Sequence, residues 1–114
     1  MKDYKFDFEV EGVNYPLVFN LNVMETIQEE FGSVQKWGEL TDGKGEEVNV
    51  KALKFGLTEM INEGIEIENE TLEEKRPLLT TKQVGRLITK MGLEKTAENL
   101  NNAVIESTKS NEKN

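Results

Sequence analysis

Residues 4–10 alternate strictly between apolar and charged side chains. The apolar positions fall on one face of an extended segment, and they are Tyr4, Phe6, Phe8 and Val10. A period of two residues is typical of a strand that buries one face. Turn residues follow at 11–14. We therefore expect a half-buried strand over residues 4–10, followed by a turn.

A second strand is expected over residues 15–21, with Tyr15, Leu17 and Phe19 on its buried face. Pro16 cannot donate a ladder hydrogen bond, so it should lie near the start of this strand or at an edge. Together the two segments predict an antiparallel hairpin over residues 1–21. An isolated hairpin is only marginally stable, so its aromatic face should pack on helices.

Apolar residues recur at helical spacing from residue 22 onward. Asn22 followed by Glu25 is a variant of the capping box. The first expected helix then carries an apolar stripe of Val23, Met24, Ile27 and Phe31. Gly32 should end it, and Ser33 should cap a short helix over 34–40. The inward residues of this short helix are Trp37 and Leu40, and a loop follows at 42–45.

A third helix is expected over 50–63, capped by Asn49 and ended by Gly64. Its predicted buried stripe is Val50, Leu53, Leu57, Met60 and Ile61. Residues 65–79 do not keep a helical period, and we interpret them as an acidic loop with a short helical turn near Leu72. The carboxylates of this loop are Glu66, Glu68, Glu70, Glu73 and Glu74.

Two closing helices complete the pattern. Thr80 and Gln83 fit a capping box, and the helix that follows places Val84, Leu87, Ile88 and Met91 on one face. Gly92 should separate it from a fifth helix that begins near Glu94 and ends at Ser107. The inward positions of that helix are Leu93, Ala97, Leu100, Ala103 and Val104. The polar residues 108–114 are expected to form a disordered tail.

These elements predict an α+β, mostly helical fold with the hairpin packed on a core of four to five helices. A single domain would span residues 1–107, with the helical part at 22–107. The expected core residues are Ile27, Phe31, Leu53, Leu57, Leu87, Ile88 and Leu100.

Composition favours binding over catalysis. The chain has 114 residues, of which 22 are acidic and 14 basic, giving a formal net charge of -8, and it has no cysteine or histidine. Nucleic-acid phosphates and anionic membranes repel such a surface. Thiolate and imidazole chemistry are excluded, together with metal sites that need those ligands. We expect no enzyme activity, cofactor or metal.

The acidic charge either serves solubility alone or suits a basic protein partner. No apolar run approaches the roughly 20 residues of a membrane helix, and the N-terminus does not read as a secretion signal, so a cytoplasmic location is expected. The loop at 42–47 lacks both the Walker pattern and the ligand spacing of a calcium loop. It is therefore interpreted as a solvated turn.

Two stretches are candidate protein-binding surfaces. The first is the region of the first two helices, with Met24, Glu30, Trp37 and Leu40, and the second is the acidic loop, with Glu70, Glu73 and Glu74. Trp37 is either an exposed interface anchor or a core residue. The acidic loop either docks a basic partner, holds a weakly bound divalent ion, or is simply solvated.

Several runs of residues carry a resemblance to a known family. They are Phe19-Asn20-Leu21-Asn22-Val23-Met24-Glu25, Glu29-Glu30-Phe31-Gly32-Ser33, the middle helix that ends at Gly64, Leu79-Thr80-Thr81-Lys82-Gln83-Val84 and Met91-Gly92-Leu93. Over residues 14–106 this order resembles the tail assembly chaperones of long-tailed phages, prophages and gene transfer agents. The acidic segment between Gly64 and Thr80 departs from the family pattern because it is longer.

The resemblance implies a protein that binds the tape measure protein and helps recruit tail tube subunits during tail assembly. Such a chaperone acts in the host cytoplasm and is absent from the mature virion. Its partners are the tape measure and tail tube proteins, a homo-oligomer is allowed, and a frameshifted form would append a second domain after the tail. Two alternatives stay open: a structural virion protein, such as a head–tail connector or tube component, and a small non-enzymatic protein-binding adaptor.

Overall fold

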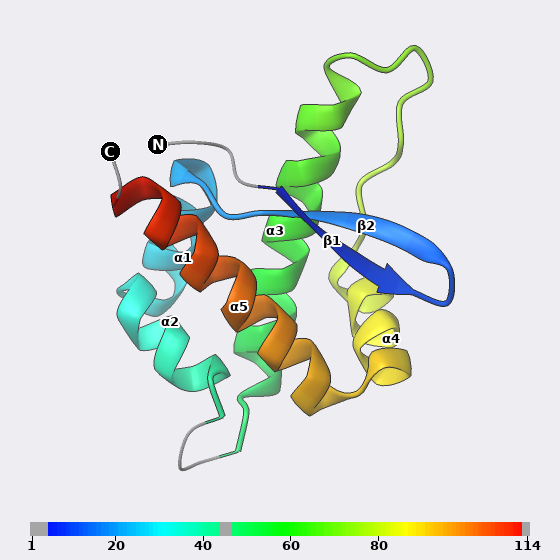
Figure 1. The fold of residues 1–114 in the computed structure, drawn as a ribbon. Helices are drawn as coiled ribbons and strands as arrows, with labels where there is room; N and C mark the ends of the chain where they lie inside the picture. The colour runs from blue at the N-terminus through cyan, green and yellow to red at the C-terminus, as the bar shows by residue number, and fades with distance from the viewer. Residues whose placement is uncertain (1–4, 44–46, 113–114) are drawn as a thin grey trace.

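The computed structural model describes residues 5–43 and 47–112, which form an N-terminal hairpin and five helices. The elements in chain order are β1 (Lys5–Val10), β2 (Val13–Val18), α1 (Leu21–Phe31), α2 (Val34–Thr41), α3 (Val50–Asn69), α4 (Thr81–Met91) and α5 (Leu93–Glu112). Figure 1 shows α3 in the middle, crossed by the hairpin, with α1 and α2 on one side and α4 on the other. α3 packs against β2 and against each of the other four helices. The expected mostly helical α+β fold is confirmed.

A two-residue turn joins the strands of the hairpin. Glu11 and Gly12 both have positive φ angles, 51° and 82°, as a type I′ turn requires. The turn predicted over 11–14 is too long, because β2 already begins at Val13. The second strand also ends earlier than predicted, at Val18.

The register brings the aromatic residues of the hairpin onto one face. Phe6 pairs with Leu17 and Phe8 pairs with Tyr15. Phe8 and Leu17 are buried, whereas Phe6 and Tyr15 are half-buried against the same core. The predicted face of the hairpin is therefore the one that meets the core, although Tyr4 lies outside the described residues.

The opposite face of β2 is covered as well, because Pro16 packs on α3. Pro16 lies at an edge, since both strands of a two-stranded sheet are edges. A Cβ added to Gly64 would come within 2.7 Å of the Pro16 Cβ atom. Gly64 therefore permits close contact between strand and helix. The prediction that it ends the third helix is wrong, since α3 continues to Asn69 with Ile65 buried.

Most helix caps were predicted correctly. The Ser33 hydroxyl accepts from Lys36 N, the Asn49 side chain accepts from Ala52 N, and Thr80 and Gln83 form a full capping box. The prediction for α1 is wrong, because Asn20, not Asn22, caps that helix and accepts from Val23 N at 3.2 Å.

The core matches the prediction at five of its seven positions. Ile27, Leu53, Leu57, Ile88 and Leu100 are buried. Phe31 and Leu87 are half-buried and pack against this cluster. Val50 is the clear error in the predicted stripe of α3, because its side chain is 53% exposed. It stands at the first position of the helix, where no neighbouring element covers it.

The C-terminal helix is longer than predicted. α5 continues past Ser107 to Glu112, so residues 108–112 of the predicted tail are helical, whereas residues 113–114 lie outside the described part. The apolar positions of this segment stop at Ile105, and their periodicity therefore gave no reason to extend the helix.

Candidate functional site

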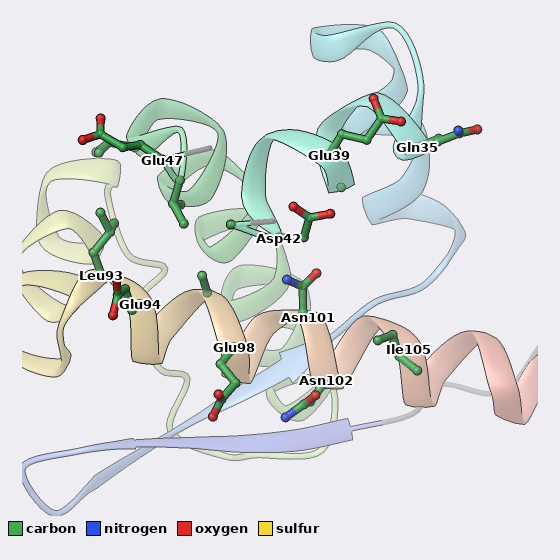
Figure 2. A pocket seen from close by; sticks show the side chains of 15 residues that line it. Gln35, Glu39, Asp42, Glu47, Leu93, Glu94, Glu98, Asn101, Asn102 and Ile105 are labelled. Carbon is green, nitrogen blue, oxygen red and sulfur yellow. The ribbon is translucent and has the colours of Figure 1, made fainter. Parts of the chain in front are cut away.

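An open groove of about 920 Å³ runs between α2 and α5 (Figure 2). We call it the α2–α5 groove. One wall is the outward face of α2 and the residues just after it, Gln35, Gly38, Glu39 and Asp42. Their spacing of three and four residues places them on one side of the helix. The inward side of the same helix carries Trp37, so α2 divides core from groove.

The second wall is one face of α5. Its lining residues recur every three or four positions over three turns, and they are Glu94, Ala97, Glu98, Asn101, Asn102 and Ile105. At 1.5 Å per residue, this stretch is about 16 Å long. The buried residues Leu100 and Ala103 lie on the other side of the helix, which anchors α5 to the core.

The start of α3 supplies apolar surface at one end of the groove. Val48, Val50 and Leu93 line it there, and Ile105 lies toward the other end of α5. Val50 and Ile105 are 53% and 50% exposed. Exposed aliphatic side chains of this size mark interaction sites when they gather in one concave region.

Carboxylates dominate the polar part of the groove. Glu39 and Asp42 come from the α2 wall, Glu94 and Glu98 from the α5 wall, and Glu47 from the segment before α3. No lysine or arginine is among the described residues that line it. The α2–α5 groove therefore combines apolar surface with a negative potential.

A smaller hollow of about 220 Å³ adjoins the groove. Val50 and Leu93 line both. Lys54 of α3, together with Gly85, Ile88 and Thr89 of α4, completes the lining of the smaller one. The apolar surface around Val50 thus continues from the groove toward α4. A side chain inserted there would contact both hollows.

The acidic segment predicted as a loop over 65–79 is shorter than expected. Its first residues belong to α3, and the connection to α4 begins at Glu70, the residue that caps the helix. Glu70, Glu73 and Glu74 are all exposed on this connection. Figure 1 shows it projecting beyond the end of α3 and returning alongside the helix.

Two asparagines of α3 hold the irregular segment that runs back along the helix to α4. Asn62 donates from its side-chain nitrogen to Leu79 O at 2.9 Å and accepts from Leu79 N at 2.8 Å. Asn69 makes the same pair of bonds with Arg76, at 2.9 Å each. The connection is therefore fixed to the helix at Arg76 and Leu79, while residues 71–75 stay exposed.

The tip of this connection folds onto the end of α3. The Lys75 ammonium donates to Leu72 O at 2.6 Å and to Asn69 O, close to the negative end of the helix dipole. Arg76 forms an ion pair with Glu68 at 3.4 Å. The basic residues here serve the local structure, which leaves the carboxylates at the outer surface.

The four candidate residues on the first two helices do not line the α2–α5 groove. Trp37 is only 1% exposed and donates from Nε1 to Ala52 O at 2.9 Å. Of its two interpretations, the structure therefore shows the core residue. Met24 and Leu40 are half-buried against the core, and Glu30 lies 3.8 Å from the Lys51 ammonium.

The sequence interpretation missed the outer face of α5. Glu94 and Glu98 are four residues apart and share that face with Ile105, a pattern that is visible in the sequence. Which element lies opposite them depends on how α2 and α5 pack together. Periodicity along one helix carries no information about that neighbour.

The described residues present two hollows and an exposed acidic connection as candidate binding surfaces. They contain no group of three or more acidic side chains that is arranged to hold a metal ion. Within the same ranges, no helix has the length and apolar character needed to cross a bilayer. No family model, curated protein or solved structure matches this chain.

Proposed function

We propose that this chain is a phage tail assembly chaperone, which binds the tape measure protein and helps to recruit tail tube subunits. The proposal joins two lines of support. The order of elements over residues 14–106 resembles that family, and the described part of the chain presents a groove suited to a protein segment. The α2–α5 groove is the observation on which it rests.

The dimensions of the groove suit a helix. Its α5 wall extends over about three helical turns, and a partner helix of similar length would lie along the open groove where α2 and α5 meet. Helices bind such grooves by inserting apolar side chains spaced three or four residues apart. A tape measure protein is long and helical, so it offers many segments of this kind.

The charge of the chain fits the role of a soluble coat. A net charge of -8 keeps bound copies apart and opposes aggregation. Apolar contact at Val50 and Ile105 would shield the partner from other hydrophobic surfaces. Both features serve a protein that keeps another protein dispersed until assembly begins.

Coexpression with the tape measure protein of the same genome tests the proposal. The chaperone should raise the soluble fraction of the tape measure protein and copurify with it through an affinity tag. A tag on the tail tube protein should recover the complex, and purified virions should lack the chain. Stoichiometric amounts in purified virions would favour a structural component instead. Failure to recover the tape measure protein would favour the alternative that this chain is a small protein-binding adaptor in another pathway.

A further inference from the structure

We propose that the α2–α5 groove binds a basic amphipathic helix, in which an apolar stripe is flanked by lysine or arginine. This specifies the partner chemistry of the site and rests on the proposed function only where the tape measure protein supplies that helix. The proposal follows from three features of the groove: its charge, its exposed apolar residues and its shape.

Charge selects the flanks of the bound helix. Glu39 and Asp42 line the groove from the α2 side and Glu94 and Glu98 from the α5 side, with the Glu39 and Glu98 carboxylates pointing away from one another (Figure 2). A helix lying between these walls would expose both of its sides to carboxylates. Lysine and arginine side chains are long enough to reach them while their alkyl stems cover apolar surface. An acidic helix would meet repulsion from both walls.

Apolar surface selects the face that points into the groove. Val50 and Ile105 are each about half exposed, whereas most aliphatic residues of their size in the described part of the chain are buried or half-buried. Ala97 also lines the groove but is only 4% exposed and packs in the core, so the accessible apolar surface is that of Val50 and Ile105. A stripe of leucine-sized residues spaced three or four apart would reach Val50 and Ile105.

A second copy of this chain is a poor occupant. Its basic helix is α4, which carries Lys82, Arg86 and Lys90 at exposed positions. The apolar residues of that helix, Val84 and Ile88, are already buried in its own core. A second copy would therefore bring basic charge without an apolar stripe, and its remaining surface shares the net negative charge.

A pair of designed peptides tests the proposal on the full chain. The first is a fluorescein-labelled helix of about 18 residues, long enough for three turns plus ends, with a leucine stripe and lysine or arginine on both flanks. The second keeps the leucine stripe and replaces every basic residue with glutamate. Fluorescence anisotropy should show saturable binding of the basic peptide alone. Absence of binding by the basic peptide, or equal binding of both, would overturn the proposal.

Matched variants separate the groove from general charge attraction. Glu94→Lys with Glu98→Lys should weaken binding of the basic peptide about tenfold, because two exposed attractions become repulsions. Glu73→Lys with Glu74→Lys makes the same change in net charge on the α3–α4 connection and should change binding less than about twofold. Equal losses in the two double variants would overturn the assignment to the groove.

Substitutions of apolar residues and a measurement of molecular mass in solution complete the test. Ile105→Ser should weaken binding about threefold or more through lost apolar contact, whereas Leu21→Ser, at a residue 66% exposed outside the groove, should not. Light scattering should give a monomer mass for the free chain. A larger mass that Glu94→Lys with Glu98→Lys reduces would make a second copy the occupant and overturn the proposal.

The outcome for peptides is independent of the proposed function. A groove that binds the basic peptide without recovering the tape measure protein would support this inference and reject the assembly role. Recovery of the tape measure protein that is unaffected by Glu94→Lys with Glu98→Lys would support the assembly role and place its contact elsewhere.

Discussion

The indole of Trp37 occupies the space that a side chain at position 56 would need. A Cβ added to Gly56 would come within 2.7 Å of the Trp37 Cε2 atom, a distance that side chains in folded proteins do not tolerate. The same ring donates its N–H to the Ala52 carbonyl and stacks at 6.3 Å on Phe19. A single glycine in α3 thus lets α2 pack closely enough to bury the tryptophan.

Gly56→Ala should therefore destabilise the fold, even though alanine favours a helix more than glycine does. We expect a loss of about 1–3 kcal/mol in the free energy of unfolding, as for overpacked cores. Urea denaturation followed by Trp37 fluorescence measures it. Gly38→Ala is the matched control, because nothing lies within 4 Å of its added Cβ in α2. It should stabilise by about 0.5–1 kcal/mol. A stable Gly56→Ala variant would contradict this packing.

The pairing of Asn62 with Leu79 predicts a local effect on the connection to α4. Asn62→Ala removes both bonds and leaves the Leu79 N–H and carbonyl without that partner. The loss should be about 1–3 kcal/mol because a partly buried pair is left unsatisfied. Hydrogen exchange at the Leu79 amide should become faster, while the amides of α1 keep their protection.

A substitution away from this connection controls for general loss of an amide side chain. Asn102→Ala replaces an exposed asparagine of α5, so it should change stability by less than about 0.5 kcal/mol. If Asn62→Ala leaves hydrogen exchange at the Leu79 amide unchanged, other contacts hold the connection between α3 and α4.

Leu57 and Val50 lie on the same helix, and the structure separates them sharply. Leu57 is fully buried in α3, whereas Val50 is 53% exposed. Leu57→Ala should cost about 2–5 kcal/mol through lost burial and the cavity left behind. Val50→Ala should cost less than about 0.5 kcal/mol, because an exposed position away from such features changes stability little. Chemical denaturation of both variants measures the contrast, and similar costs would contradict the depth assigned to them.

The same pair shows how far the sequence predicts this fold. Apolar periodicity identifies α3 and its buried side, since Leu53, Leu57 and Ile61 follow the helical period. The period also includes Val50, because a pattern along one helix does not reveal where neighbouring elements stop. The exposed end of the stripe is therefore an observation of tertiary structure, and in this chain it lies in the candidate groove.

The glycines show a second limit. Gly32 and Gly92 have φ angles of 93° and 102° and end their helices as predicted. Gly64 is also a glycine but lies inside α3, where it leaves room for Pro16 to pack against the helix. A position can require glycine because its φ angle is positive or because a neighbouring element leaves no room for a side chain. Only the contact with another element distinguishes them.

The candidate site was predictable in character but not in place. The net negative charge and the acidic face of α5 are both visible in the sequence. The expected contact residues lay on α1, α2 and the α3–α4 connection. The groove arises where α2 meets α5, two segments separated by about half of the chain. Both helices also pack on α3, so their contact depends on how each of them packs there.

Glu59 predicts a specific pH dependence of folding stability. Partial burial in α3, followed by the negative charges of Glu63 and Glu66, raises the pKa of Glu59 above its ordinary value of 4.5. Glu63 lies one turn beyond it and is itself held by the Asn20 and Asn22 amides, at 2.7 and 3.1 Å. The folded chain therefore binds the Glu59 proton more tightly than the unfolded chain does.

The sign of the effect follows from this difference in proton affinity. Above the raised pKa, ionised Glu59 makes an unfavourable contribution to folding, and that contribution is relieved as the pH falls toward 4.5. Glu59→Gln removes the charge, so this variant should be more stable than the parent chain near neutral pH. The difference should shrink as the pH is lowered through the raised pKa. Urea denaturation over the range from about pH 7 to about pH 4 measures it. Glu74→Gln, on the exposed α3–α4 connection, serves as the control for losing one negative charge. A difference between Glu59→Gln and the parent chain that stays constant with pH would show that neutralisation acts through packing or helix propensity instead.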